Sequence, residues 1–241
     1  MKLKYLKLIS PLIFLSLTFL CRQVSASGIP ALEPVVKDDR ILILAPHPDD
    51  EAIACAGVIQ EALKKKARIK IVYLTNGDHN QLAFIVYEKR LVFRRGEFIH
   101  MGEVRRQEAQ KAMIGLGLKQ EDLIFLGYPD FGTFAMWTRY WASPKPFKSL
   151  LTRMTKVPYP ENYSYGRDYI PQNILSDLQK IIENYRPNKI FVSHPADTNG
   201  DHRSLNLFLS VAMWNLEGKI PRPRIYAYLV HHTDWPLKRK Y

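Results

Sequence analysis

The sequence is poor in cysteine and glycine. Two of its 241 residues are cysteine, Cys21 and Cys55, and 12 are glycine. So few cysteines exclude a disulfide-rich scaffold and a zinc site built from thiolates, and so few glycines exclude a collagen-like chain. With 46% hydrophobic residues, the composition indicates a globular protein, and its length predicts one domain or at most two.

Long hydrophobic runs are also scarce, and the one that stands out lies near the N-terminus. Leu8–Leu20 is predominantly apolar, three lysines precede it, and Val24-Ser25-Ala26 gives a small-residue cleavage signal after it. The run is shorter than the ~20 residues of a membrane span, so the pattern predicts a secretory signal peptide over residues 1–26, cleaved after Ala26. We therefore expect a secreted or periplasmic protein with one mature domain, residues 27–241, and no stable membrane span. An uncleaved anchor is the alternative.

Acidic residues are fewer than basic ones, 23 against 35, which gives a formal net charge of +12. Removing residues 1–26 takes away four basic residues and no acidic ones, which leaves 31 against 23, a net charge of +8. The basic residues that remain are scattered along the chain, for example at Lys64–Lys66, Lys89-Arg90, Arg105-Arg106 and Lys238–Lys240. Because a nucleic-acid-binding protein usually concentrates its charge on one face or helix, we expect no nucleic-acid partner.

From residue 40 onward, apolar segments of strand length alternate with segments of helical periodicity. The expected strands are Arg40–Pro46, Arg68–Thr75, Leu123–Gly127, Lys189–Ser193 and Arg224–Val230. The expected helices are Glu51–Lys66, Glu103–Gly117, Pro171–Tyr185 and Asp201–Glu217. Strands separated by helices pair in parallel through right-handed crossovers. The pattern predicts an α/β fold, a Rossmann-like, doubly wound and mostly parallel five-stranded sheet with helices on both faces.

Two segments interrupt this alternation. Residues 79–102 show no clear period, and residues 128–170 are rich in proline and aromatic residues. A loop this long inside a compact domain is usually functional or disordered, and the aromatic content argues against disorder. We expect residues 128–170 to form a packed loop insertion over the rim of the sheet.

Reactive side chains gather after the first and fourth expected strands, where a doubly wound sheet binds its ligands. His47, Asp49 and Asp50 follow the first strand, and a segment from His194 to His202 follows the fourth. His47 and Asp50 lie three residues apart at a strand-to-helix turn, so their side chains can converge. Either His202 or His194 can supply a third ligand, and spacing alone does not choose between them.

Two histidines and one carboxylate form the ligand set of a catalytic zinc site, whose fourth position is open to water. Bound Zn²⁺ lowers the pKa of that water to about 7, and Asp49, next to Asp50 in sequence, can take its proton as a general base. The alternative is that Asp49 or Asp50 only caps the following helix. The pattern predicts metal-dependent hydrolysis of an amide or an ester.

The string Ala45-Pro46-His47-Pro48-Asp49-Asp50-Glu51 resembles the signature of the PIG-L (LmbE-like) zinc-dependent deacetylases, which remove an N-acetyl group from GlcNAc-type sugars. The resemblance runs from about residue 40 to residue 230 and includes Thr75-Asn76-Gly77-Asp78, Arg105 with Glu108, Tyr128-Pro129-Asp130 and Asp201-His202-Arg203. It implies His47, Asp50 and His202 as zinc ligands and Asp49 as general base. It also implies that Arg105 and Asp130 contact the substrate.

One residue departs from the family's pattern. Many members have a histidine three residues before the zinc-binding one, where it is thought to stabilise the oxyanion, and this chain has Asn199. Asparagine donates a hydrogen bond but carries no positive charge, so stabilisation would depend on zinc with Asn199, or on His194. Trp137 and Trp141 are the aromatic residues expected to stack on a sugar.

The resemblance predicts a Zn²⁺ hydrolase that deacetylates an N-acetylated amino sugar of a glycan or glycolipid by attack of metal-bound hydroxide. The expected partner is therefore a small-molecule or glycan substrate that carries an N-acetyl group. Two alternatives stay open: a zinc amidase acting on another acylated amine, such as a sugar–thiol conjugate, and a carbohydrate-binding protein that has lost turnover. His231 and His232 follow the last expected strand and could also touch the substrate.

Overall fold

The computed structural model describes residues 32–79 and 95–232. The chain divides into a unit Met1–Pro34 and a unit Val35–Tyr241, and all described helices and strands belong to the second unit. The signal peptide predicted over residues 1–26 lies outside the described residues. Among the residues described, none of the helices has both the length and the apolar character needed to cross a membrane.

Five parallel strands form one sheet. Their bounds are β1 Arg40–Ala45, β2 Arg68–Thr75, β3 Leu123–Tyr128, β4 Lys189–Ser193 and β5 Arg224–Tyr228. Their order is β3-β2-β1-β4-β5, and every neighbouring pair is parallel. The predicted α/β class, the five strands and the doubly wound order are confirmed. The bounds of β2 and β4 match the expected ones, and the C-terminal ends of β1, β3 and β5 differ from them by one or two residues. From β1 the chain adds β2 and β3 on one side of the sheet and then returns to add β4 and β5 on the other side. The boundary between β1 and β4 is therefore the topological switch point.

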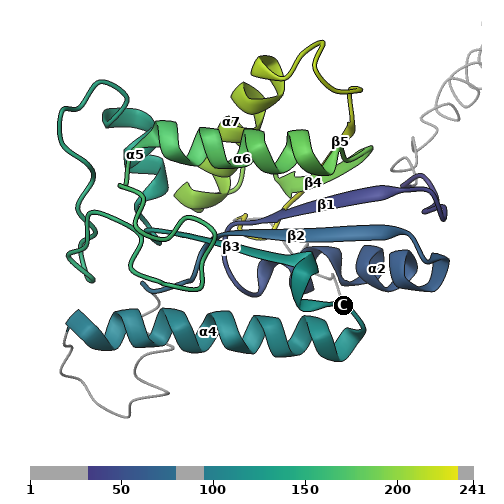
Figure 1. The fold of residues 1–241 in the computed structure, drawn as a ribbon, viewed down its shortest axis with the longest axis horizontal. Helices are drawn as coiled ribbons and strands as arrows, with labels where there is room; N and C mark the ends of the chain where they lie inside the picture. The colour runs from purple at the N-terminus through teal and green to yellow at the C-terminus, as the bar shows by residue number, and fades with distance from the viewer. Residues whose placement is uncertain (1–31, 80–94, 233–241) are drawn as a thin grey trace, which may run out of the picture. The chain divides into compact units, whose positions relative to one another are not determined.

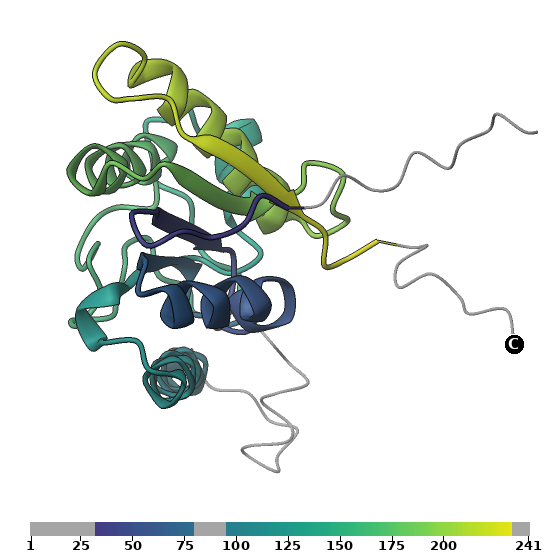
Figure 2. The same ribbon diagram turned by 90° about the vertical axis from the view of Figure 1, so that its right-hand side faces the viewer.

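Helices cover both faces of the sheet (Figures 1 and 2). The helices α2 Asp50–Lys65 and α4 Arg95–Leu116 lie on one face, and α5 Thr133–Arg139, α6 Pro171–Tyr185 and α7 Gly200–Asn215 lie on the other. Side chains of β1 alternate between two cores, with Leu42 and Leu44 packed in the α6–α7 layer and Ile41 and Ile43 in the α2–α4 layer. Burial on both faces explains why β1 is apolar throughout instead of alternating with polar residues.

Helix α4 begins at Arg95, well before the expected Glu103. Residues 95–102 of the segment expected to be irregular are therefore helical, and residues 80–94 lie outside the described residues. Gly102 inside the helix masks the period, yet close packing requires it, because a Cβ there would collide with the hydroxyl of Tyr159. The extra turns bury Phe98 and Met101 against Leu151.

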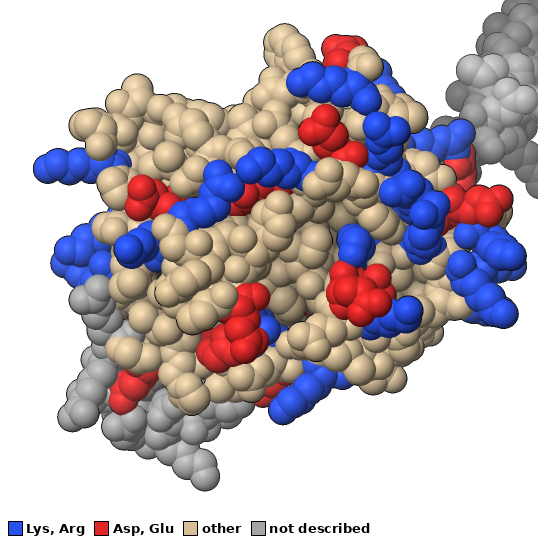
Figure 3. All heavy atoms as spheres, viewed as in Figure 1, with Lys and Arg blue, Asp and Glu red and all other residues tan. Residues whose placement is uncertain are grey.

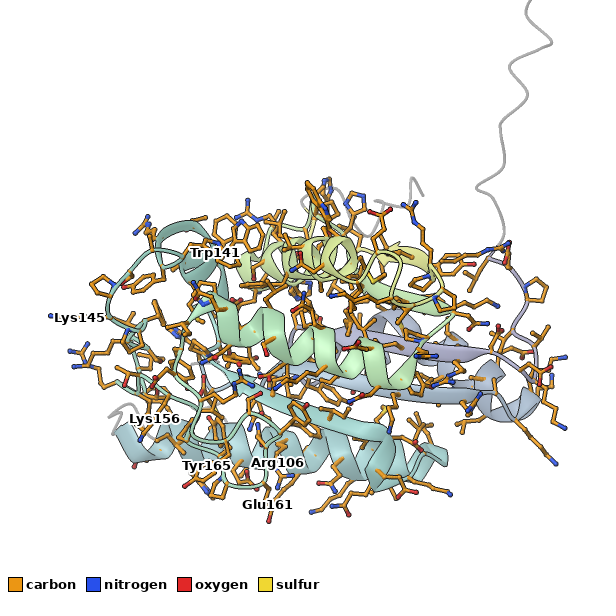
Figure 4. All side chains as sticks on the ribbon, turned by 45° about the horizontal axis from the view of Figure 1, so that its top comes forward. Arg106, Trp141, Lys145, Lys156, Glu161 and Tyr165 are labelled. Atoms are coloured by element: carbon orange, nitrogen blue, oxygen red, sulfur yellow. The ribbon has the colours of Figure 1, made fainter. Side chains whose placement is uncertain are left out.

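The aromatic insertion over residues 128–170 is packed, as expected. Tyr128, Tyr159 and Tyr169 are fully buried in the core. Arg106 of α4 makes an ion pair of 2.7 Å with Glu161 of the insertion, and both lie on the same side of the molecule in Figure 4. The insertion also contains α5, a helix that the sequence reading missed.

Charged side chains are mixed on the molecular face shown in Figure 3, where Asp and Glu lie among Lys and Arg. Lys189, at the start of β4, is buried with Asp39 at 2.6 Å, so part of the basic charge is paired inside the fold. This distribution agrees with the scattered positions of the basic residues in the sequence.

Candidate active site

A cavity of about 440 Å³ lies at the carboxyl ends of the strands, where β1 and β4 meet. Residues that follow each of the five strands line it, together with Arg105 of α4 and Ile53 of α2. In strand order from β1 to β5, the former are His47, Asp49 and Asp50 after β1, His79 after β2, Asp130 and Phe131 after β3, Asn199 after β4 and His231 after β5. Six segments distant in sequence, five of which follow strands, therefore meet at the switch point.

His47, Asp50 and His202 come together beside this cavity, and all three are buried. Oδ2 of Asp50 lies 3.2 Å from Nδ1 of His47 and 3.1 Å from Nε2 of His202. Burial favours protonation of Asp50, but its contacts with His202 and His47 outweigh that effect and hold its pKa below the usual range. Nε2 of His202 is buried and has no hydrogen-bond partner of good geometry among the described residues. An ionised carboxylate between two imidazoles, one with an orphaned nitrogen, suits a Zn²⁺ ion.

The outer nitrogens of both rings face buried carboxylates. Nε2 of His47 lies 3.1 Å from Oδ1 of Asp130 and 3.4 Å from Oδ2 of Asp201. Nδ1 of His202 lies 3.1 Å from Oδ2 of Asp197. Such partners orient a metal-binding histidine and leave its inner nitrogen available as a ligand. Asp130, expected to contact substrate, is thus placed against His47 while it also lines the cavity.

Asp49 occupies the N-cap position of α2 but makes no capping hydrogen bond with its side chain, so its carboxylate serves the cavity and not the helix. Its side chain is 53% exposed, and burial of the carboxyl end together with the charge of Asp50 raises its pKa. Its φ of 145° is strained for a residue with a side chain, a cost of about 1–3 kcal/mol. The backbone N–H of Asp49 donates to Oε2 of the buried Glu51 at 3.0 Å, which helps to hold this conformation.

Arg105 of α4 fixes the other side of Asp49. Its Nη2 donates to Oδ2 of Asp49 at 3.1 Å and to the carbonyl of Pro48 at 2.9 Å. Its Nη1 donates to the carbonyl of Gly77 at 3.0 Å. The family resemblance implied a substrate contact for Arg105, and the structure places it on the carboxylate of the expected base.

Gly77 makes room for this arginine. Its φ is +69°, and a Cβ there would collide with Nη1 of Arg105. We expect Gly77→Ala to lower substrate turnover at least tenfold, because the displaced guanidinium no longer holds Asp49. The matched control is Gly166→Ala, whose φ is +75° but whose Cβ would meet open space. Both variants carry the backbone strain of ~1–2 kcal/mol, so equal turnover in the two would contradict this role of Gly77.

Asn199 and His194, the other two residues expected near the substrate, differ in where they lie relative to the cavity. Asn199 lines the cavity and caps α7, because its Oδ1 accepts a hydrogen bond from the backbone of Asp201 at 2.8 Å. His194 is exposed, its Nδ1 accepts a hydrogen bond from the backbone of Ala196 at 3.0 Å, and it does not line the cavity. The structure therefore brings Asn199 to the candidate site and leaves His194 outside it.

Phe131 presents its aromatic side chain on the cavity wall, a position that the sequence pattern did not predict. It is 62% exposed, and its ring lies 5.0 Å from that of His79. Its backbone has a φ of 56° and donates to Oδ2 of Asp201 at 2.6 Å. Trp137 and Trp141, expected to stack on a sugar, pack against Phe208 of α7 instead. The sequence feature that could have indicated Phe131 is its position directly after Asp130, close to the carboxyl end of β3.

A family model and a curated relative match this chain in sequence. The family model described as PIG-L, GlcNAc-PI de-N-acetylase, matches residues 42–213. An N-acetylglucosaminyl-phosphatidylinositol de-N-acetylase from Arthroderma benhamiae is 30% identical over 103 residues, which are 39% of this chain and 29% of that protein. The match thus spans less than a third of the length of that curated relative.

Solved structures share the fold. The N,N'-diacetylchitobiose deacetylase from Pyrococcus horikoshii has a TM-score of 0.53 at 18% identity, covering 91% of this chain and 70% of that chain. The 4-carboxy-2-hydroxymuconate hydratase from Pseudomonas putida has a TM-score of 0.53 at 15% identity, covering 78% of this chain and 64% of that chain. Both a deacetylase and a hydratase are built on this fold, so the reaction has to be argued from the site residues.

Proposed function

Because the chain belongs to the PIG-L family, we propose that it is a zinc-dependent hydrolase that removes the acetyl group from the nitrogen of an amino sugar. One observation carries the proposal. The buried cluster of His47, Asp50 and His202 lies beside a cavity on which the carboxylate of Asp49 is half exposed and held by Arg105. A ligand set and a separate base are what hydrolysis of an unactivated amide needs.

In this proposal Nδ1 of His47, Oδ2 of Asp50 and Nε2 of His202 would hold the metal. Zn²⁺ bound there would supply positive charge and lower the pKa of a water to about 7. Asp49 takes a proton from the attacking water, and Arg105 holds the carboxylate of Asp49 through Oδ2. The water oxygen bonds to the acetyl carbon, the carbon–nitrogen bond breaks, and Asp49 returns the proton to the leaving amine. The products are acetate and the free amino sugar.

A sugar substrate is supported by the exposed ring of Phe131, since the apolar face of a pyranose packs against an aromatic ring. We expect Phe131→Ala to raise KM for an N-acetylated sugar about tenfold and to leave kcat nearly unchanged, a loss of ~1.4 kcal/mol of binding. Trp141→Ala is the matched control, because Trp141 is 37% exposed but does not line the cavity. A larger effect from Trp141→Ala than from Phe131→Ala would contradict the assignment of Phe131 as the sugar platform.

The decisive experiment measures acetate released by the zinc-loaded protein from a panel of N-acetylated substrates: GlcNAc, its oligomers, GlcNAc-phosphatidylinositol and an N-acetylated amine without a sugar. The proposal expects release from one or more sugars and none from the simple amine. Release from the simple amine alone would favour a general amidase. Calorimetric binding of a sugar without release of acetate under any metal tested would favour a carbohydrate-binding protein.

A further inference from the structure

His231 follows β5, the last strand of the sheet, and yet lies on the cavity wall. Its backbone carbonyl accepts hydrogen bonds from the backbone N–H of Thr198 at 2.8 Å and from the Thr198 hydroxyl at 3.1 Å. Its backbone N–H donates to Oδ2 of Asp197 at 3.0 Å. The loop between β4 and α7 therefore fixes His231 at the cavity through three hydrogen bonds.

Asp197 also connects His231 to the metal cluster. Its carboxylate is buried, with Oδ2 3.1 Å from Nδ1 of His202 and Oδ1 3.5 Å from Nδ1 of His231. The two rings meet edge to face, with centroids 4.7 Å apart and planes at 85°. One buried carboxylate thus lies against the ring of His202 and beside a second ring, that of His231, whose side chain is 47% exposed.

The nitrogen donors of Arg105 and His47 on the cavity wall are already engaged. The Nη1 and Nη2 groups of Arg105 donate to two backbone carbonyls and to Asp49, and both ring nitrogens of His47 face carboxylates. On the β4–β5 side, Asn199 spends its Oδ1 on the helix cap and keeps its amide N–H groups. A carbonyl oxygen bound on that side therefore meets two side-chain donors, Asn199 and His231.

We propose that His231 is a catalytic residue that donates a hydrogen bond to the acetyl carbonyl oxygen as negative charge develops there, an inference that rests on the proposed function. The 3.5 Å between Nδ1 and Asp197 exceeds an ordinary hydrogen bond, so the ring can present an N–H at Nε2. When the water oxygen bonds to the acetyl carbon, the carbonyl π electrons move to oxygen. A fixed donor stabilises this charge more than that of the neutral substrate.

The test compares His231→Ala with His232→Ala, a substitution at the neighbouring histidine, which does not line the cavity. Removing one oxyanion donor typically costs about 10²–10³ in kcat, so His231→Ala is expected to lower kcat for acetate release about 100-fold with KM changed less than threefold. His231→Gln, which keeps an N–H donor, is expected to regain at least a third of the decrease in log kcat. His232→Ala is expected to keep at least half of the wild-type kcat.

A second measurement does not depend on turnover. A methylphosphonamidate of glucosamine imitates the tetrahedral, negatively charged acetyl group, and its Kd is expected to rise about 100-fold in His231→Ala while the Kd of glucosamine stays within threefold. Zinc content, measured by mass spectrometry, is expected to equal that of the wild type. A His231→Ala protein with wild-type kcat, or one that has lost its zinc, overturns the role proposed for His231 and leaves the proposed function standing. A wild-type protein that neither releases acetate nor binds the phosphonamidate overturns the proposed function as well.

Discussion

Asp49→Asn is expected to lower kcat for acetate release by about 10³-fold while the protein keeps its zinc. General acid–base groups contribute about 10²–10⁴ to rate, and an amide cannot take the proton of the attacking water. Asparagine has nearly the same shape as aspartate and tolerates positive φ better than most residues, so the strained backbone at 145° should survive the change. The expected loss is therefore chemical and not conformational.

The measurement is kcat on the best N-acetylated sugar of the panel, together with zinc content and the melting temperature. Asp38→Asn is the matched control, because Asp38 is an exposed aspartate just before β1, whereas Asp49 follows the other end of that strand. A zinc-loaded Asp49→Asn protein that retains more than a tenth of the wild-type kcat would show that another group accepts the proton.

The convergence of His47 and Asp50 with a histidine after β4 could be predicted because it depends on topology, whereas spacing left His194 and His202 open and the family resemblance chose His202. His47 and Asp50 follow β1, His202 lies just after the N-terminus of α7, and the strand order places these turns side by side. Parallel strands of a doubly wound sheet present their carboxyl ends at one edge, so reactive residues after adjacent strands converge whatever their separation in sequence.

The roles of the carboxylates that face the rings of His47 and His202 could not be predicted. Asp130, Asp197 and Asp201 all stand in segments that the sequence marks as reactive, but their partners depend on how the two imidazole rings are turned. Ring orientation follows from packing against several elements at once, and no local pattern encodes it. The same is true of His194, whose ring turns back onto the backbone of Ala196 instead of entering the cavity.

The choice of aromatic residue also depended on packing. Trp137 and Trp141 have the larger apolar surface, but α5 places them against Phe208, at ring distances of 5.0 and 6.0 Å. Phe131 stays exposed because its backbone, with φ at 56°, is held by Asp201 and turns the ring outward over the cavity. This backbone conformation is rare for a residue with a bulky side chain, so the sequence does not indicate it.

Removing zinc with a chelator is expected to abolish acetate release and to lower the melting temperature by roughly 8–16 °C. A ligand that binds only the folded state at 1,000 times its Kd adds about 4.1 kcal/mol of stability, and each kcal/mol shifts the melting temperature by about 2–4 °C in a domain of this size. The buried Asp50 carboxylate between two imidazoles makes the cluster the place where this stabilisation arises. Adding Zn²⁺ back should restore both quantities.

His202→Ala separates this site from any other metal site in the protein. The variant lacks the ligand whose Nε2 is buried without a hydrogen-bond partner of good geometry among the described residues, so chelator should no longer change its melting temperature. His202→Gln serves as the second variant if alanine fails to fold, since glutamine fills more of the space of the ring. Chelated protein that stays active, or a His202 variant that melts lower on chelation by as much as the wild type, would place the functional metal away from His47, Asp50 and His202. Asp49 lies outside this proposed ligand set. Chelator should therefore remove zinc from Asp49→Asn and lower its melting temperature by as much as in the wild type. The effect of the base on kcat and the effect of the metal on stability are thus measured separately.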